Sequence, residues 1–196
     1  MLTPAFTRTR LHAAAFALLA FGLFAAPASA SRGVYQCAGS LDIPQTDGQP
    51  ATAATAITCL VNVERTSRGI PALKPDADLA QAAGGHAADM SRRRFFAHVN
   101  TSGEGLSARL RDAGYGNPGD GWYAAEDLGW GTGDRATPNA IVDAWLNSPH
   151  HRRILLSPTY EELGVGVAQG APKPTMSGLP GATYTLDLGT IRVGGD

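Results

Sequence analysis

The sequence predicts a single exported α+β domain, and three observations support this fold class. Apolar side chains recur at helical spacing in two stretches, which begin near residues 53 and 76. Thr137-Pro138 and Ser148-Pro149 are start signals for further helices, because a hydroxyl can cap free backbone N–H groups and proline suits the first helical position. The stretch 184–188 alternates apolar and polar residues, which is typical of a strand.

Residues 1–30 have the features of a secretory signal peptide. Two arginines precede an apolar run over residues 13–26, which closes with the small residues Ala28-Ser29-Ala30. The run is shorter than the ~20 residues of a membrane-spanning helix, and Ser31 stands where a lipid-anchored protein would have a cysteine. We therefore expect a secreted, extracellular protein without a transmembrane segment after signal cleavage.

The remaining chain divides into an extended N-terminal arm, residues 31–52, and one domain, residues 53–196. About 165 mature residues suit a single domain with its own core. The net charge is −1 for the whole chain and −1 − 2 = −3 without the two signal arginines, so no nucleic-acid partner is expected. Arg92, Arg93 and Arg94 end a predicted helix, and a solvated face is favoured there over an anion site.

Cys37 and Cys59 are the two cysteines of the chain. In an oxidising compartment we expect them to form a disulfide bond between the arm and the first helix. The bond would close a loop of roughly 20 residues and contribute about 3 kcal/mol in the chain-entropy model. A metal-binding pair is the alternative, but it needs more ligands nearby than the sequence supplies.

Three helices are predicted in the first half of the chain. One begins at Ala53 and is stopped by Gly69 and Pro71. The next is capped by Asp76, and Gly84-Gly85 within it predicts a bend or the close approach of another backbone. The third runs from Leu106 to Ala113 and is ended by Gly114. The apolar faces of the first two contain Ile57, Leu60, Val61, Leu79, Ala82, Ala83, Ala87 and Met90.

The second half is predicted to supply the strands and the helices that begin after Thr137 and Ser148. Strands are expected over Trp122–Trp130, Leu163–Ala168 and Tyr184–Val193, with a bulge at Gly189. The Gly- and Pro-rich residues 170–181 form the connection between the last two strands, and we expect this connection to be mobile.

Candidate functional side chains occur in four places. His86 lies on an apolar helical stripe and is interpreted as a core histidine bonded to the backbone. His98 follows two phenylalanines at the start of a polar loop, which is a better position for function. Adjacent helical residues point about 100° apart, so His150 and His151 cannot both face one site. Glu126 and its neighbour Asp127 alternate on a strand, so only one of them points at a given site.

Five blocks of sequence together carry a family resemblance: FFAHVNTSGEGLSARLRDAGY (95–115), AEDLGWG (125–131), WLNSPHHRRILLSP (145–158), ELGVGVA (162–168) and YTLDLGT (184–190). In this order they resemble the blocks of the bacterial CAP domain. The superfamily includes cysteine-rich secretory proteins, antigen 5 and plant pathogenesis-related protein 1. The resemblance covers residues 58–193, nearly all of the mature chain.

The resemblance implies an α-β-α sandwich with a small antiparallel sheet between helical layers. It also implies a surface cleft that carries His98, Glu126 and His151. His150 stands where bacterial members usually have glycine, and Ser148 stands where many eukaryotic members have a second glutamate. Asp127 replaces the asparagine that usually follows the glutamate.

Two imidazoles and a carboxylate suit a divalent metal such as zinc, with a fourth position left to water. If the three residues converge without metal, the carboxylate should raise the pKa of both histidines. A Ser148-His151-Glu126 triad is disfavoured, because Ser148 is explained as a helix cap.

Our preferred hypothesis is a non-catalytic extracellular binding module whose cleft holds a metal, a small or lipidic ligand, or a protein partner. The alternative is a secreted metal-dependent hydrolase, a protease or an esterase, for which Ser148 leaves no obvious general base. A structural protein of the cell envelope is a third class.

Overall fold

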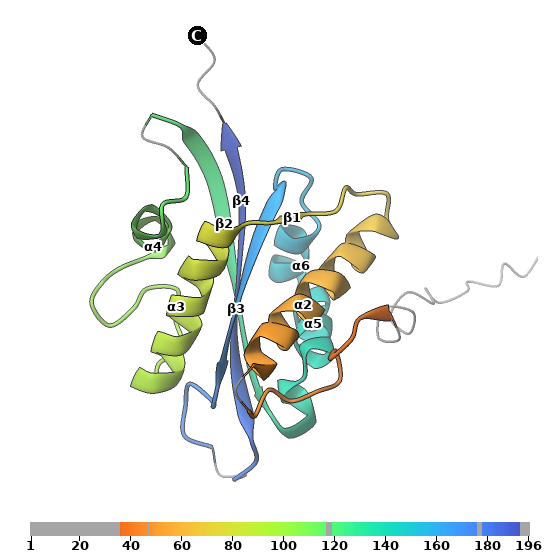
Figure 1. Ribbon diagram of the computed structural model, residues 1–196, viewed down its shortest axis with the longest axis vertical. Helices are drawn as coiled ribbons and strands as arrows, with labels where there is room; N and C mark the ends of the chain where they lie inside the picture. Colours follow the sequence, from red (N-terminus) through yellow and green to blue (C-terminus); the bar gives the residue numbers. More distant parts are fainter. Residues whose placement is uncertain (1–35, 47, 117–118, 176–177, 193–196) are drawn as a thin grey trace, which may run out of the picture.

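The computed structural model describes residues 36–46, 48–116, 119–175 and 178–192, and the predicted signal peptide lies outside them. A four-stranded sheet of order β1-β3-β4-β2 separates two layers of helices (Figure 1). Its strands are β1 (Lys74–Pro75), β2 (Gly121–Thr132), β3 (Glu162–Gln169) and β4 (Gly181–Arg192). The three long strands are antiparallel, and the short β1 pairs in parallel with β3. The predicted sandwich is confirmed.

One face of the sheet is covered by α2 (Gln49–Thr66), α5 (Pro138–Asn147) and α6 (Pro149–Leu155) (Figure 1). The main apolar core lies on this face and includes Ile57, Leu60, Val61, Trp145, Tyr184, Leu186 and Leu188. Trp145 fixes α5 against β2, because its indole N–H donates to the Leu128 carbonyl at 2.9 Å. In the described part of the chain, no helix is long and apolar enough to cross a membrane.

The other face is covered by α3 (Ala77–Arg93) and α4 (Leu106–Ala113) (Figure 1). Here α3 lies almost directly on β3, since a Cβ added to Gly164 or Gly166 would overlap the α3 backbone near Ala80 or Ala83. The close approach expected at Gly84-Gly85 therefore exists, but the glycines that permit it are on the strand. Nothing lies within 4 Å of the positions where Gly84 or Gly85 would carry a Cβ.

Helix caps agree with the sequence at two of three positions. Asp76 accepts a hydrogen bond from the Leu79 N–H at 2.9 Å, and Thr137 accepts one from the Ala140 N–H at 3.3 Å. Ser148 precedes α6 as expected, but its side chain makes no capping hydrogen bond. The serine cap was therefore a wrong prediction.

Two further expectations are corrected by the structure. The first helix begins at Gln49, earlier than Ala53, because Pro50 occupies an initial helical position after Gly48. The predicted bulge at Gly189 is absent, since the pairing of β4 with β2 runs without a break from Gly181 to Arg192. Gly189 instead leaves room for the Tyr115 hydroxyl, which a Cβ would overlap.

Cys37 and Cys59 form the predicted disulfide, with their Cα atoms 5.7 Å apart. Because Cys59 lies within α2, the bond fixes the arm at Cys37 to the layer formed by α2, α5 and α6. Cys37 is itself part of the main apolar core.

Candidate functional site

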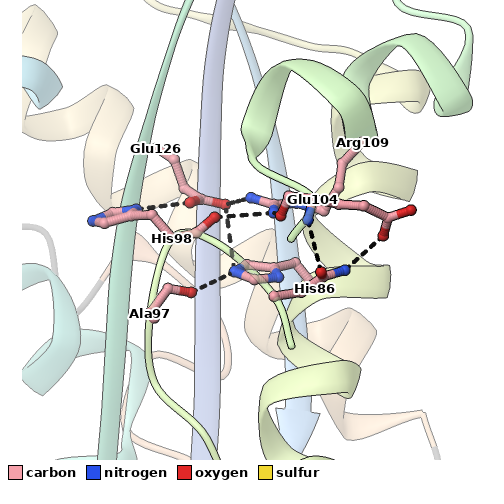
Figure 2. Close-up of polar contacts among 7 residues, drawn as sticks. His86, Ala97, His98, Glu104, Arg109 and Glu126 are labelled. Carbon is pink, nitrogen blue, oxygen red and sulfur yellow. Dashed lines mark hydrogen bonds and ion pairs between the residues drawn. The ribbon is translucent and has the colours of Figure 1, made fainter. Parts of the chain in front are cut away.

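Glu126 is the centre of the site, and its carboxylate is almost completely buried on β2. Its Oε1 accepts a hydrogen bond of 2.7 Å from His98 Nδ1 (Figure 2). Because the carboxylate accepts, the Nδ1 of His98 carries a hydrogen, and Nε2 remains for other partners. The His98 side chain is 58% exposed. The site therefore holds a rigid carboxylate beneath an imidazole that faces solvent.

Arg109 of α4 engages the second oxygen of Glu126. Its guanidinium donates to Oε2 at 2.6 Å and also to the carbonyls of His98 and Glu104, at 3.0 and 3.1 Å (Figure 2). One arginine thus neutralises Glu126 and fixes both ends of the loop that carries His98. Both carboxylate oxygens of Glu126 are occupied by protein partners, so the role of Glu126 is to orient His98 and Arg109.

His86 of α3 lies beneath the Glu126–Arg109 ion pair and is buried. Its Nε2 donates to the Ala97 carbonyl at 2.9 Å and lies 3.9 Å from Glu126 Oε2 (Figure 2). Burial is the main cause that lowers the pKa of His86. The sequence interpretation as a core histidine bonded to the backbone is confirmed, although the residue also supports the segment before His98.

Two more carboxyl groups lie near Glu126. Asp187 of β4 is its direct partner in the strand register, so the two project from the same face of the sheet. Burial, and then the nearby Glu126, raise the pKa of Asp187 well above its ordinary value. Asp127 pairs with Leu186 and so projects from the opposite face, as strand alternation predicts. Burial raises the pKa of Asp127 to about 8.

His151 comes from α6, on the other side of the sheet from α3. Arg65 of α2 holds the segment after α6, since its guanidinium donates to the carbonyls of Leu155, Ser157 and Tyr160. His150 is exposed and contacts Arg153. His151 is near enough to His98 for the two charges to interact.

The pKa expectation for the histidines holds for one of them. The hydrogen bond from Glu126 is the largest cause that raises the pKa of His98. In contrast, burial lowers the pKa of His151, and the charges of His150 and His98 lower it further. The expected rise at His151 is wrong, because burial and then the neighbouring imidazoles His150 and His98 all disfavour its charged form.

Of the predicted set, the structure brings His98 and Glu126 into contact and places His151 within electrostatic range of His98. In the described part of the chain, no group of three His, Cys, Asp or Glu side chains is arranged to hold a metal ion. The described geometry does not fit a zinc centre made by all three residues. A ligand site that includes them stays a prediction.

Arg109, Glu104 and Asp187 were not identified from the sequence. Arg109 lies on a short helix of mixed charge, where an arginine is typical of a solvated face. Asp187 alternates with core leucines, which in isolation indicates the outer face of a strand. Asp187 lies beside Glu126 because β2 pairs with β4, and a pairing between distant strands cannot be read from a local pattern.

A family model supports the resemblance seen in the sequence blocks. Residues 59–179 match the model of the cysteine-rich secretory protein family, CAP. The chain belongs to the CAP family. The match spans more than half of the chain and includes His98, Glu126 and His151.

Two relatives of this CAP domain come from Bacillus subtilis strain 168. The uncharacterized membrane protein YlbC is 35% identical over 116 residues, which are 59% of this chain and 32% of YlbC. The uncharacterized protein YkwD is 29% identical over 118 residues, which are 56% of this chain and 40% of YkwD. The aligned region spans less than half the length of either relative.

Solved structures show the same fold. An extracellular protein with an SCP domain from Bacillus anthracis aligns with a TM-score of 0.59 and 27% identity, over 76% of this chain and 45% of that one. An outer surface protein of Borrelia burgdorferi aligns with a TM-score of 0.52 and 20% identity, over 68% of this chain and 89% of that one. The latter similarity concerns the fold alone.

Proposed function

We propose that this CAP domain is a non-catalytic binding module that acts outside the cell. The observation that carries the proposal is the His98–Glu126–Arg109 arrangement, in which a buried carboxylate orients one exposed imidazole. Such an arrangement presents a single nitrogen, His98 Nε2, to a ligand. The extracellular location of the Bacillus anthracis relative supports the same location here.

The charges of the site favour the anionic or acceptor end of a small or lipidic ligand. Arg109 neutralises the charge of Glu126, so the three residues His98, Glu126 and Arg109 together carry a net positive charge when His98 is protonated. An imidazolium donates through Nε2, and a carboxylate or phosphate oxygen is a strong acceptor for it. His151 adds positive charge nearby when it is protonated.

Zinc is the second candidate ligand, held by His98 and His151 without Glu126, because metal-bound histidines commonly donate their other nitrogen to a carboxylate, as His98 does. The two ligands require opposite protonation states of His98. A carboxylate ligand is bound best by the imidazolium, at low pH, whereas a metal requires the neutral imidazole, at high pH.

Calorimetric titration of the protein with oleate and with zinc chloride, at pH 5.5 and 7.5, tests the proposal. We expect oleate to bind more tightly at the lower pH, and we expect His98→Ala to weaken it by about tenfold, the loss of one charged hydrogen bond. His150→Ala is the matched control and should leave binding unchanged. Zinc binding that strengthens at pH 7.5 and requires His98 and His151 would favour the metal.

A hydrolase would be recognised by turnover. Chelator-sensitive cleavage of peptide or ester substrates that is lost in Glu126→Gln would overturn the binding-module proposal. Ser148 forms no hydrogen bond with His151 among the contacts of the described residues, which is why we do not favour a serine triad. If neither probe binds and His98→Ala changes nothing, the site has only a structural role.

A further inference from the structure

A pocket away from the His98–Glu126 site is lined by residues at the end of α3, the end of β3 and the start of β4. These three ends lie at the same end of the sheet (Figure 1). Its volume is about 580 Å³, within the range of small-molecule sites. The pocket shares no lining residue with the His98–Glu126 site. Arg94, Lys173, Gln45 and Gln169 supply its long polar side chains.

The charge of this pocket has one sign. Arg94 and Lys173 contribute two cations, and among the described lining residues there is no aspartate or glutamate. Arg93, the preceding residue, differs because it is paired with Asp89 at 3.0 Å. Lys173 is held by a cation–π contact, with its Nζ 5.9 Å from the centre of the Phe96 ring. The pocket is therefore positively charged, and one of its cations is ordered by an aromatic contact.

Arg94 has an unusual backbone conformation. It ends α3 in the left-handed region, with φ 60° and ψ 44°, and it is the sole residue other than glycine with positive φ in the described part of the chain. Glycine, or sometimes asparagine, is usual at such a helix end, because a Cβ there is strained. Strained residues cluster at functional sites. An arginine at this position suggests that its side chain has a use.

Hydrogen bonds fix the part of the pocket where α3, β3 and β4 meet. Ser91 donates to the Gln169 carbonyl at 2.5 Å and so ties the end of α3 to β3. The Gly170 N–H donates to the Gly181 carbonyl at 2.7 Å, and the Thr183 hydroxyl donates to the Gly170 carbonyl at 2.8 Å. A pocket that is formed before binding loses little entropy when a ligand enters.

We propose that this pocket binds the oxyanion of a small polar ligand, a phosphate or carboxylate group contacted by Arg94 and Lys173. An arginine fork matches the geometry of either group, and a lysine adds a point charge. The Gln45 and Gln169 side chains offer donors and acceptors to hydroxyl groups on the rest of the ligand. A sugar phosphate or a sugar acid has this combination of groups.

The test is calorimetric titration of the protein with glucose 6-phosphate, glucuronate and glucose at about 0.15 M salt, where long-range charge effects are screened. We expect at least one anionic sugar to bind and glucose to bind at least tenfold more weakly. The two anionic probes distinguish phosphate from carboxylate. Arg94→Gln and Lys173→Gln should each weaken binding by about tenfold or more, as expected for a charged hydrogen bond.

Matched controls lie away from the pocket. Arg192→Gln removes the same charge at the opposite end of β4, and Lys74→Gln does so on β1. Both should leave the affinity unchanged. Arg94→Gly should raise the melting temperature, because it removes backbone strain. The same variant should bind the anionic sugars more weakly, because it lacks the guanidinium. The proposal is overturned if neither anionic sugar binds, if glucose binds equally well, if the controls weaken binding equally, or if Arg94→Gly retains full affinity.

Discussion

Three buried carboxyl groups on β2 and β4 differ because, among the described residues, only Glu126 of the three forms ion pairs. Glu126 receives His98 on one oxygen and Arg109 on the other. Asp127, on the opposite face, has no hydrogen-bond partner for either oxygen in the described part of the chain. A buried carboxylate without partners is unfavourable, so Asp127 retains its proton well above the usual range.

Asp127→Asn should stabilise the protein in a pH-dependent manner. The ordinary pKa of 3.8 applies to the unfolded chain, whereas the folded pKa is about 8. Between these values the unfolded state binds fewer protons, so the stability of the unmodified protein falls as pH rises, by about 1.4 kcal/mol per unit at most. Asparagine does not ionise, so the variant should gain relative stability from pH 4 to pH 8.

Urea denaturation at pH 4.5 and 7.5 measures this effect. The variant should differ little from the parent at pH 4.5 and should be more stable at pH 7.5, by roughly 1 to 4 kcal/mol. Asp112→Asn, at an exposed position on α4, is the control and should show no such trend. If the variant and the parent were equally stable at pH 4.5 and also at pH 7.5, Asp127 would be solvated or paired in solution.

At the scale of elements, the position of α3 on the sheet determines the geometry of the site. His86 is on α3, and the loop after α3 carries His98. Gly164 and Gly166 of β3 allow the α3 backbone to approach the strand. A displacement of α3 would therefore move His86 and the start of the loop away from Glu126.

Gly166→Ala should destabilise the protein, because the added methyl group would overlap the α3 backbone at Ala83 and Gly84. Overpacking of this kind costs about 1 to 3 kcal/mol, and more where backbone must move. Gly84→Ala is the matched control, since its Cβ would meet nothing within 4 Å. It should stabilise α3 by about 1 kcal/mol. Urea denaturation of both variants checks the prediction, which fails if the two changes have the same sign.

Much of the secondary structure could be predicted from the sequence because its signals are local. The caps at Asp76 and Thr137 depend on residues within one helical turn. The contacts of Arg109 and Asp187 with Glu126 join separate elements, so no local pattern contains them. His98 was a candidate from its position in a polar loop, whereas its grouping with Glu126 was implied by the family resemblance, which carries long-range information that periodicity lacks. The left-handed backbone conformation of Arg94 likewise has no signal in the sequence.

At the scale of the whole molecule, the two helical layers have separate supports. The disulfide and Arg65 stabilise the layer of α2, α5 and α6, whereas the Glu126 network lies between the sheet and the layer of α3 and α4. Loss of the disulfide should therefore reduce global stability without changing the immediate surroundings of Glu126.

The Cys37→Ala/Cys59→Ala double variant tests this separation. The bond joins residues 22 positions apart, so its loss should lower the free energy of unfolding by about 3 kcal/mol in the chain-entropy model. Urea denaturation measures that change, and an NMR titration of His98 reports on the site. Because the Glu126 hydrogen bond raises the pKa of His98, an intact network should preserve the raised value in the folded variant. A pKa that returns to the ordinary histidine value while the variant remains folded would show that the two layers are coupled through the sheet.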